Sequence, residues 1–209
     1  EYGFASLLKD VSKIEGIRRL SFATSHPKNF DEDILEVMAG TPSICRAINL
    51  PVQSGSDRIL KDMNRGYTRN QYIELVQRIR SVLPDVSLTT DLIVGFPQET
   101  EEDFKDSYDL LKELRFDIIH TAAYSPREGT KAAIMEGQID NKVKAARLNE
   151  INALQSQLAR ELNEEYVGRK FEILVDGPAP RGEGSLQGRT KTDKVVIIKG
   201  GPEYMGRYI

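Results

Sequence analysis

The sequence predicts an α/β fold in which part of a parallel (β/α) barrel is followed by a small all-β domain. Segments typical of strands alternate four times with amphipathic helical segments up to Tyr124, which indicates a parallel sheet with crossover helices. From Tyr166 onward, short β-branched runs flank a loop rich in Gly and Pro, as in small β-barrels. Four strands cannot close an eight-stranded barrel, so the parallel sheet is either open or continued by strands upstream of Glu1, and we expect the second.

The predicted helices carry apolar residues at spacings of three and four, which is the pattern of an amphipathic helix. Thr68 and Gln71 have the spacing of a capping box, and Ser56 is a suitable N-cap for a shorter helix. The longest helix is interpreted as a connecting helix packed on the body. The predicted helices are Phe4–Ile14, Asp31–Met38, the short segment after Ser56, Thr68–Val82, Glu101–Leu114 and Lys142–Tyr166.

The strand Leu88–Val94 is the centre of the predicted sheet. It ends at Gly95, and Thr100 then caps a helix with an acidic first turn. Asp91 is unusual because a carboxylate inside an apolar strand is costly to bury unless it is paired. It makes either a structural hydrogen bond or a contact with a ligand hydroxyl, such as a ribose diol. The other predicted strands are Leu20–Ala23, Ala47–Val52, Asp117–Tyr124, Phe171–Val175 and Val195–Ile198.

The composition is that of a soluble globular protein. The chain has 209 residues, of which 39% are hydrophobic and 29% charged, enough for one large or two modest domains. We expect a cytoplasmic protein without a membrane partner, because no apolar run approaches the length of a membrane span and no signal peptide precedes the fold. The single cysteine, Cys45, is expected to be buried; alone it cannot hold a metal cluster, so we expect no metal ligands in this chain.

The charge is distributed unevenly along the chain. The net charge is −3, but residues 166–209 contain eight Lys and Arg against five Asp and Glu, whereas residues 1–165 contain 21 against 27. A mildly basic tail on an acidic body indicates that the tail contacts any polyanionic partner.

Several short motifs follow one another in an order that covers the whole chain. They are Thr24-Ser-His-Pro27, Leu50-Pro-Val-Gln-Ser-Gly-Ser56, Met63-Asn-Arg-Gly-Tyr-Thr68, Thr90-Asp-Leu-Ile-Val-Gly-Phe-Pro97, Tyr124-Ser-Pro-Arg127 and Gly188-Arg-Thr190. Together they resemble the radical S-adenosylmethionine (SAM) methylthiotransferases. The second and last motifs are similar to the MiaB-type branch, which modifies tRNA. The chain departs from the family pattern at Gln98, where glycine is common.

The resemblance implies a division into three parts. Residues 1–140 correspond to the later part of a radical SAM partial barrel, 141–166 to a connecting helix, and 167–209 to a TRAM domain that binds RNA; the sequence leaves open whether this last domain is complete. The family uses two [4Fe–4S] clusters, whose cysteines are missing here. We therefore expect the chain to be a fragment of a longer enzyme, inactive by itself.

The resemblance also implies that SAM lies across the carboxyl ends of the strands. Amide and carboxylate oxygens accept hydrogen bonds from a diol, and a guanidinium forms a bidentate pair with a carboxylate. The expected contacts are Gln53 and Asp91 with the ribose, Arg65 with the methionine carboxylate, Ile93 and Ala123 with the adenine, and Thr24 or Ser25 with a further polar group. His26, next to Pro27, is interpreted as a structural turn residue.

With the TRAM resemblance, the basic residues of the tail are expected to contact RNA phosphates, which position RNA without reading its sequence. Arg127, at the end of the last barrel strand, is expected to contact the substrate nucleotide. The expected phosphate contacts are Arg169, Lys170, Arg189, Lys191 and Lys194. The implied partner is the anticodon stem-loop of a tRNA, together with an electron donor.

The family implies a methylthiotransferase that modifies carbon 2 of N6-isopentenyladenosine next to the anticodon. One alternative is a methylthiotransferase acting on threonylcarbamoyladenosine in tRNA or on an aspartate of a ribosomal protein. The other is a non-catalytic RNA-binding module, which would bind RNA with a salt-dependent affinity but would not bind SAM.

Overall fold

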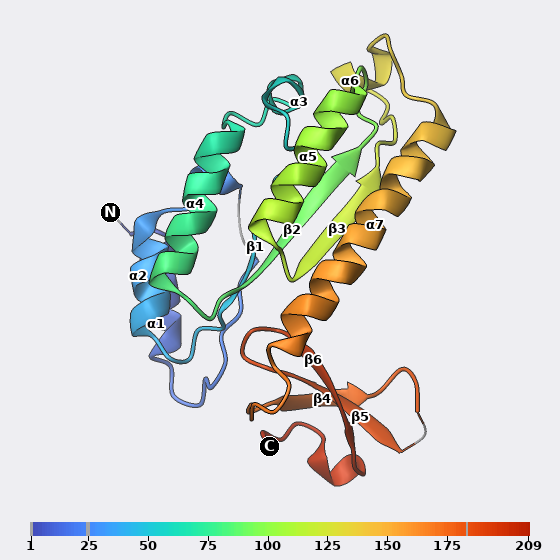
Figure 1. Cartoon of the computed structure of the whole chain (residues 1–209). Helices are drawn as coiled ribbons and strands as arrows, with labels where there is room; N and C mark the ends of the chain where they lie inside the picture. Colours follow the sequence, from blue (N-terminus) through green and yellow to red (C-terminus); the bar gives the residue numbers. More distant parts are fainter. Residues whose placement is uncertain (1, 24–25, 183) are drawn as a thin grey trace.

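The computed structural model describes residues 2–23, 26–182 and 184–209 (Figure 1). It contains a parallel sheet of three strands in the order β1-β2-β3 and a separate antiparallel sheet in the order β4-β5-β6. The α/β prediction with a small all-β domain is therefore confirmed. The strands are β1 (Ala47–Asn49), β2 (Ser87–Val94), β3 (Ile118–Ala123), β4 (Leu174–Pro178), β5 (Ser185–Arg189) and β6 (Val195–Lys199).

The helices α4, α5 and α7 cover one face of the parallel sheet (Figure 1). Their apolar stripes meet the buried strand residues Leu88 and Leu92 in one continuous core. The helices are α1 (Phe4–Ser12), α2 (Glu32–Gly40), α3 (Asp57–Asp62), α4 (Arg69–Val82), α5 (Glu101–Leu114), α6 (Lys131–Ile134) and α7 (Asn141–Glu164), with short 3₁₀ turns at Pro27–Asn29 and Pro202–Tyr204.

The two faces of the parallel sheet differ in exposure. In β2, Leu88, Thr90, Leu92 and Val94 are buried under the helices, while the alternating residues from Thr89 to Ile93, including Asp91, are only half-buried. Since side chains alternate along a strand, the half-buried residues share the opposite face. This accessible face carries the polar residues of the candidate site.

The local helix signals of the sequence are confirmed. Helix α5 spans the predicted residues, and both Thr68 and Thr100 accept a hydrogen bond from the N3 backbone in complete capping boxes. Helix α7 buries Ile151 and Leu158 against the sheet, as expected of a connecting helix packed on the body. Cys45 is buried, as expected.

Two local predictions are wrong. The segment predicted as a strand at Leu20–Ala23 makes only an isolated bridge between Leu20 and Ile44, so the parallel sheet has three strands, not four. The strand predicted from Phe171 begins at Leu174, and β5 was not predicted. Ser56 is the N-cap residue of α3, but its side chain accepts no cap hydrogen bond; its hydroxyl instead donates to the Asp103 carboxylate at 2.6 Å.

The small sheet packs at the amino ends of the parallel strands (Figure 1). The Arg46 backbone N–H, just before β1, donates to the Lys191 carbonyl at 3.1 Å. The Lys194 ammonium pairs with Asp117, just before β3, at 2.6 Å. Within the described part of the chain, no helix has the length and apolarity needed to cross a membrane.

Candidate functional site

The carboxyl edge of the parallel sheet brings Gln53 together with β2. After β1, the chain rejoins β2 at Gln53, whose N–H donates to the Asp91 carbonyl at 2.8 Å and whose carbonyl accepts from the Ile93 N–H at 3.0 Å. Gln53 adopts a left-handed conformation with φ 70°, which is costly for a non-glycine residue. Such strain persists where the surrounding structure requires it, often at ligand sites.

Asp91 lies on the accessible face of β2, and its pairing comes from a side chain rather than from the backbone. Its Oδ2 accepts from Asn49 Nδ2 at 2.9 Å, and Asn49 Oδ1 accepts in turn from the Thr89 hydroxyl at 2.8 Å. Among the described residues, Asn49 is the one hydrogen-bond donor to this carboxylate. The other carboxylate oxygen can accept from a ligand hydroxyl. Sequence analysis missed Asn49, although it lies in a strand opposite Thr89.

Arg65 follows α3 and carries a guanidinium nitrogen that lacks a partner among the described residues. This nitrogen, Nε, is buried. The neighbouring Tyr67 donates its hydroxyl to the carbonyls of Pro51 and Val52, at 3.1 and 2.9 Å, and so holds this segment against the end of β1. Burial raises the pKa of Tyr67 to about 12, so its hydroxyl remains a donor at neutral pH. A ligand anion would supply what Arg65 lacks.

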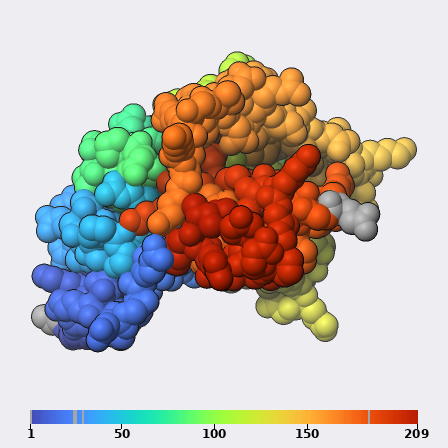
Figure 2. All heavy atoms as spheres, turned by 90° about the horizontal axis from the view of Figure 1, so that it is seen from below, coloured from blue at the N-terminus to red at the C-terminus, as the bar shows by residue number. Residues whose placement is uncertain are grey.

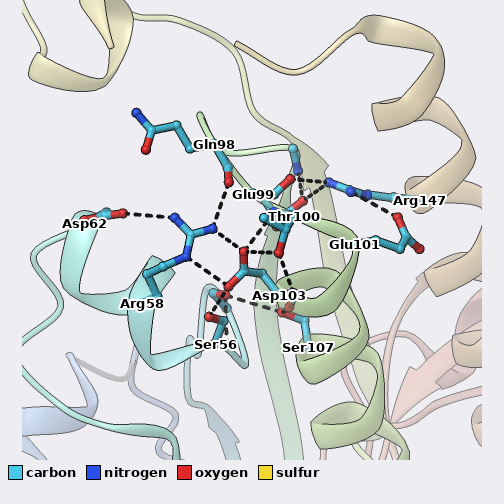
Figure 3. A network of polar contacts seen from close by, with 12 residues as sticks. Ser56, Arg58, Asp62, Gln98, Glu99, Thr100, Glu101, Asp103, Ser107 and Arg147 are labelled. Carbon is cyan, nitrogen blue, oxygen red and sulfur yellow. Dashed lines mark hydrogen bonds and ion pairs between the residues drawn. The ribbon is translucent and has the colours of Figure 1, made fainter. Parts of the chain in front are cut away.

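The turn between β2 and α5 is held by two ion pairs, shown in Figure 3. On one side, the Gly95 N–H and Arg147 Nη1 both donate to Glu99 Oε2, at 2.6 and 2.7 Å. On the other side, the Asp103 carboxylate accepts from Arg58 and from the Ser56 hydroxyl. These contacts fix the turn from both flanks.

The two carboxyl groups in this network differ in pKa. Burial raises the pKa of Glu99, and the Gly95 N–H and the Arg147 charge offset only part of that rise. Burial acts in the same direction on Asp103, but hydrogen bonds from Arg58, Ser56 and Thr100 outweigh it and hold the pKa of Asp103 well below its ordinary value. Asp103 is therefore the firmly ionised member of the network.

Gln98 in the same turn has φ 63°, a left-handed conformation that glycine adopts without strain. Its backbone is held at both ends, because its N–H donates to the Gly137 carbonyl and its carbonyl accepts from Arg58, each at 2.8 Å. Gln98 therefore replaces the glycine common in the family without loss of the turn, because these two backbone hydrogen bonds hold its conformation.

A groove lies at the junction of the small sheet with the body. Three of the predicted phosphate-binding residues, Arg169, Lys170 and Lys191, line it together with Tyr166 and Phe171. Its charged lining is completed by one further cation and three acids, which are Arg19, Asp85, Glu165 and Glu172. The two aromatic rings lie 5.3 Å apart between centroids. Figure 2 looks onto this end of the molecule, with the small sheet in red below the orange helix α7. Cations around an aromatic pair are typical of surfaces that bind nucleic acid.

The other predicted phosphate contacts are already engaged. Arg189 pairs with Asp176 and Asp193, at 3.2 and 3.0 Å, while Lys194 pairs with Asp117 across the domain junction. Arg127 is exposed after β3, at the opposite end of the sheet from the groove.

A model of the radical SAM superfamily matches residues 2–111, more than half of the chain. The chain belongs to the radical SAM superfamily. A TRAM domain model matches residues 164–209, which contain the small sheet and most of the residues that line the groove.

The curated relatives extend over both parts of this radical SAM chain. Proteins named tRNA-2-methylthio-N(6)-dimethylallyladenosine synthase, from Carboxydothermus hydrogenoformans and Pelotomaculum thermopropionicum, are 47% and 45% identical over 99% of the chain. The chain covers 47% and 46% of their lengths, so it spans about half of these relatives. The resemblance to MiaB-type methylthiotransferases inferred from the motifs is confirmed.

Among solved structures, the archaeal Methanocaldococcus infernus Elp3 with an N-terminal deletion is similar in fold. It has a TM-score of 0.52 at 14% identity, with 88% of this chain and 57% of that chain covered.

In the radical SAM part, the strand register separates two predicted adenine contacts. Ile93 is in register with Ala122, whereas Ala123 is in register with Val94, which faces the helices. Ala122 therefore shares the accessible face with Ile93, and the contact of Ala123 with adenine remains a prediction. His120, which the sequence analysis did not select, is in register with Asp91 on the same face.

Two other predicted polar contacts, Thr24 and Ser25, lie outside the described residues. The adjacent His26 is the N-cap of the 3₁₀ turn, and its Nδ1 accepts from the Lys28 N–H at 3.3 Å. Burial lowers the pKa of His26, and the charges of Arg65 and Lys28 lower it further. The N-cap contact agrees with the interpretation of His26 as a structural turn residue.

Across the described ranges, no three His, Cys, Asp or Glu side chains gather as a metal site. The chain's one cysteine is buried next to the Leu20–Ile44 bridge and offers no ligand set for an iron–sulfur cluster.

Proposed function

We propose that this chain is the later part of a tRNA methylthiotransferase that modifies carbon 2 of N6-isopentenyladenosine next to the anticodon. The observation that carries the proposal is the match of both domains, in one alignment over 99% of the chain, to synthases of that name. Neither a radical SAM fold nor a TRAM domain alone would identify this substrate, because folds host many activities.

The residues at the carboxyl edge fit SAM. Gln53 and Asp91 offer oxygen acceptors to the ribose hydroxyls, and the unsatisfied guanidinium of Arg65 suits the methionine carboxylate. When bound, one SAM molecule would supply the methyl group and a second, on reductive cleavage, would supply the radical that activates the base carbon. This chain's share is to bind and orient that cofactor. The two [4Fe–4S] clusters require cysteines that this chain lacks.

The TRAM groove fits the phosphate backbone of the anticodon stem. Arg169, Lys170 and Lys191 supply positive charge, and the Tyr166–Phe171 pair supplies aromatic surface. Strand β2 has eight residues and spans roughly 26 Å, so RNA held in the groove must extend along the sheet to reach the carboxyl edge. Arg127 is exposed at that edge and is our candidate for the target nucleotide, which must leave its stack to react.

Mass spectrometry of tRNA nucleosides tests the proposal. A strain lacking the full-length gene should lose 2-methylthio-N6-isopentenyladenosine and accumulate the unthiolated nucleoside, and expression of the gene should reverse both changes. Loss of the methylthio form of threonylcarbamoyladenosine, or of ribosomal-protein methylthiolation, would instead establish one of the alternative substrates. Binding of tRNA without binding of SAM would indicate a non-catalytic RNA-binding module. We place the active enzyme in the cytoplasm with a reducing electron donor, since its substrate and chemistry require both.

A further inference from the structure

Helix α7, which leads into the TRAM domain, also reaches the carboxyl edge of the radical SAM sheet. We propose that Arg147 of this helix is a positioning residue for SAM, acting through Glu99 on the turn that follows β2. The inference rests on the proposed function, because it requires that the carboxyl edge binds SAM.

The contacts of Arg147 are buried and directional (Figure 3). The side chains of Arg147 and Glu99 are 7% and 1% exposed, and Arg147 Nη1 donates to both Oε2 and the backbone carbonyl of Glu99, at 2.7 and 3.2 Å. A second guanidinium nitrogen donates to Glu101 at 3.1 Å. Two acceptors of Glu99, in the turn before α5, and one of Glu101, at the start of α5, therefore fix one guanidinium.

Glu99 connects Arg147 to the backbone at the end of β2. The oxygen that accepts from Arg147 also accepts from the Gly95 N–H at 2.6 Å, and Gly95 lies two residues after Ile93. Gly95 has φ 72°, and a Cβ at this position would lie 2.4 Å from Lys144 Cγ. The last strand residues of β2 and helix α7 are thus in direct contact, with no room for a side chain between them.

Lys144, one turn before Arg147, holds the neighbouring strand. Its ammonium donates to the Tyr124 carbonyl, directly after β3, at 3.0 Å. One face of α7 therefore fixes the ends of both β2 and β3, the strands that carry Asp91, Ile93 and Ala122.

Net stabilisation alone is a weak explanation for this arrangement. The desolvation cost of a buried ion pair often cancels its attraction, and apolar residues of similar volume commonly serve as well. What an arginine adds is direction, because its planar fork fixes the position of a carboxylate. At this place the fixed carboxylate holds the backbone at the cofactor edge.

The test compares variants of the full-length enzyme, reconstituted with its clusters under anaerobic conditions. Arg147→Gln removes the charge and Arg147→Lys retains it. Glu161→Gln is the control, because Glu161 lies on the same helix far from the edge and pairs there with Arg115 at the end of α5. The readouts are the SAM dissociation constant, the tRNA dissociation constant, and hydrogen exchange of residues 94–99.

We expect R147Q to weaken SAM binding about tenfold and to speed amide hydrogen exchange at Gly95 and Glu99. Tenfold is the lower end of the loss seen when a residue that orients the direct contacts of a site is removed. R147K should recover part of the affinity, and E161Q should change neither quantity. All variants should bind tRNA as tightly as the unsubstituted enzyme. In combination with E99Q, R147Q should cost less than the sum of the two single changes, since both act through one contact.

Unchanged SAM affinity in R147Q, or equal losses of SAM and tRNA affinity, would overturn the inference and leave Arg147 a purely structural residue. If R147Q weakens SAM binding but nucleoside analysis reveals a different product, the inference holds and the proposed substrate fails. If the unsubstituted enzyme does not bind SAM, both fail.

Discussion

Substitution of Asp103 by Asn tests how the start of α5 is held. The Asp103 carboxylate accepts from the Ser56 hydroxyl at 2.6 Å, from the Thr100 N–H and hydroxyl at 2.8 and 2.6 Å, and from Arg58. Asparagine has nearly the same shape but no charge, and its amide NH2 group would face the donor groups of Ser56 or Thr100 in place of an accepting oxygen. Hydrogen bonds to charged groups are worth about 1.5–3 kcal/mol each, against about 1 for neutral ones.

The expected loss of stability follows from these contacts. The Ser56 bond is buried and counts fully, whereas the Thr100 bonds are only partly buried and Arg58 is 44% exposed, so these contacts must be discounted for solvent screening. The free energy of unfolding should fall by about 3 kcal/mol. For a domain of this size, the midpoint of thermal unfolding should fall by roughly 6–12 °C.

Chemical and thermal denaturation at pH 7 measure this change, with Asp62→Asn as the control. Asp62 pairs with the same Arg58, at 3.8 Å, but is more exposed, so its loss should cost about 0.5 kcal/mol or less. If D103N is no more destabilised than D62N, the reasoning about the buried network is refuted.

The effect of D103N should also depend on pH. Because the pKa of Asp103 is lower in the folded protein than its ordinary value of 3.8, the unfolded chain binds the proton more readily. The stability contributed by this carboxylate is present above pH 3.8 and is lost as the pH falls toward the lowered pKa. The difference between D103N and the unsubstituted protein should therefore narrow in acid. A difference that stays constant would contradict the assigned shift.

The remaining predictions concern ligands. Asp91→Ala and Arg65→Ala should each weaken SAM binding by the full-length enzyme about tenfold, as expected for lost charged contacts, and unchanged affinity by equilibrium binding would exclude these roles. Lys191→Ala should weaken tRNA binding and reduce the slope of log affinity against log salt concentration by about 1. Lys194→Ala should instead lower the thermal midpoint, because it removes the pair with Asp117. Equal salt slopes for the two variants would argue against tRNA binding in the groove. Residues 1–209 alone should produce no methylthiolated nucleoside, and any product by mass spectrometry would refute the need for the missing cysteines.

The helix ends were predictable because the interactions that form them are local. The Thr68 and Thr100 boxes join residues three apart, and α5 begins and ends where the sequence places it. The sequence could not show that Leu20–Ala23 forms no strand. A strand needs a partner, and here the partner segment meets this one only at Ile44. Apolar residues such as Leu20 and Phe22 permit a strand without ensuring one.

The sequence by itself determined the order of the elements, the radical SAM and TRAM assignments, and the residue types suited to SAM and RNA. Only the tertiary structure decided which side chains meet: Asn49 with Asp91, and Arg147 with Glu99, partners 42 and 48 residues apart. It also separated Lys191, in the groove, from Lys194, in an ion pair. The physical reason is that helix hydrogen bonds and caps join neighbours in the chain, whereas sheet register and buried ion pairs depend on how distant segments pack.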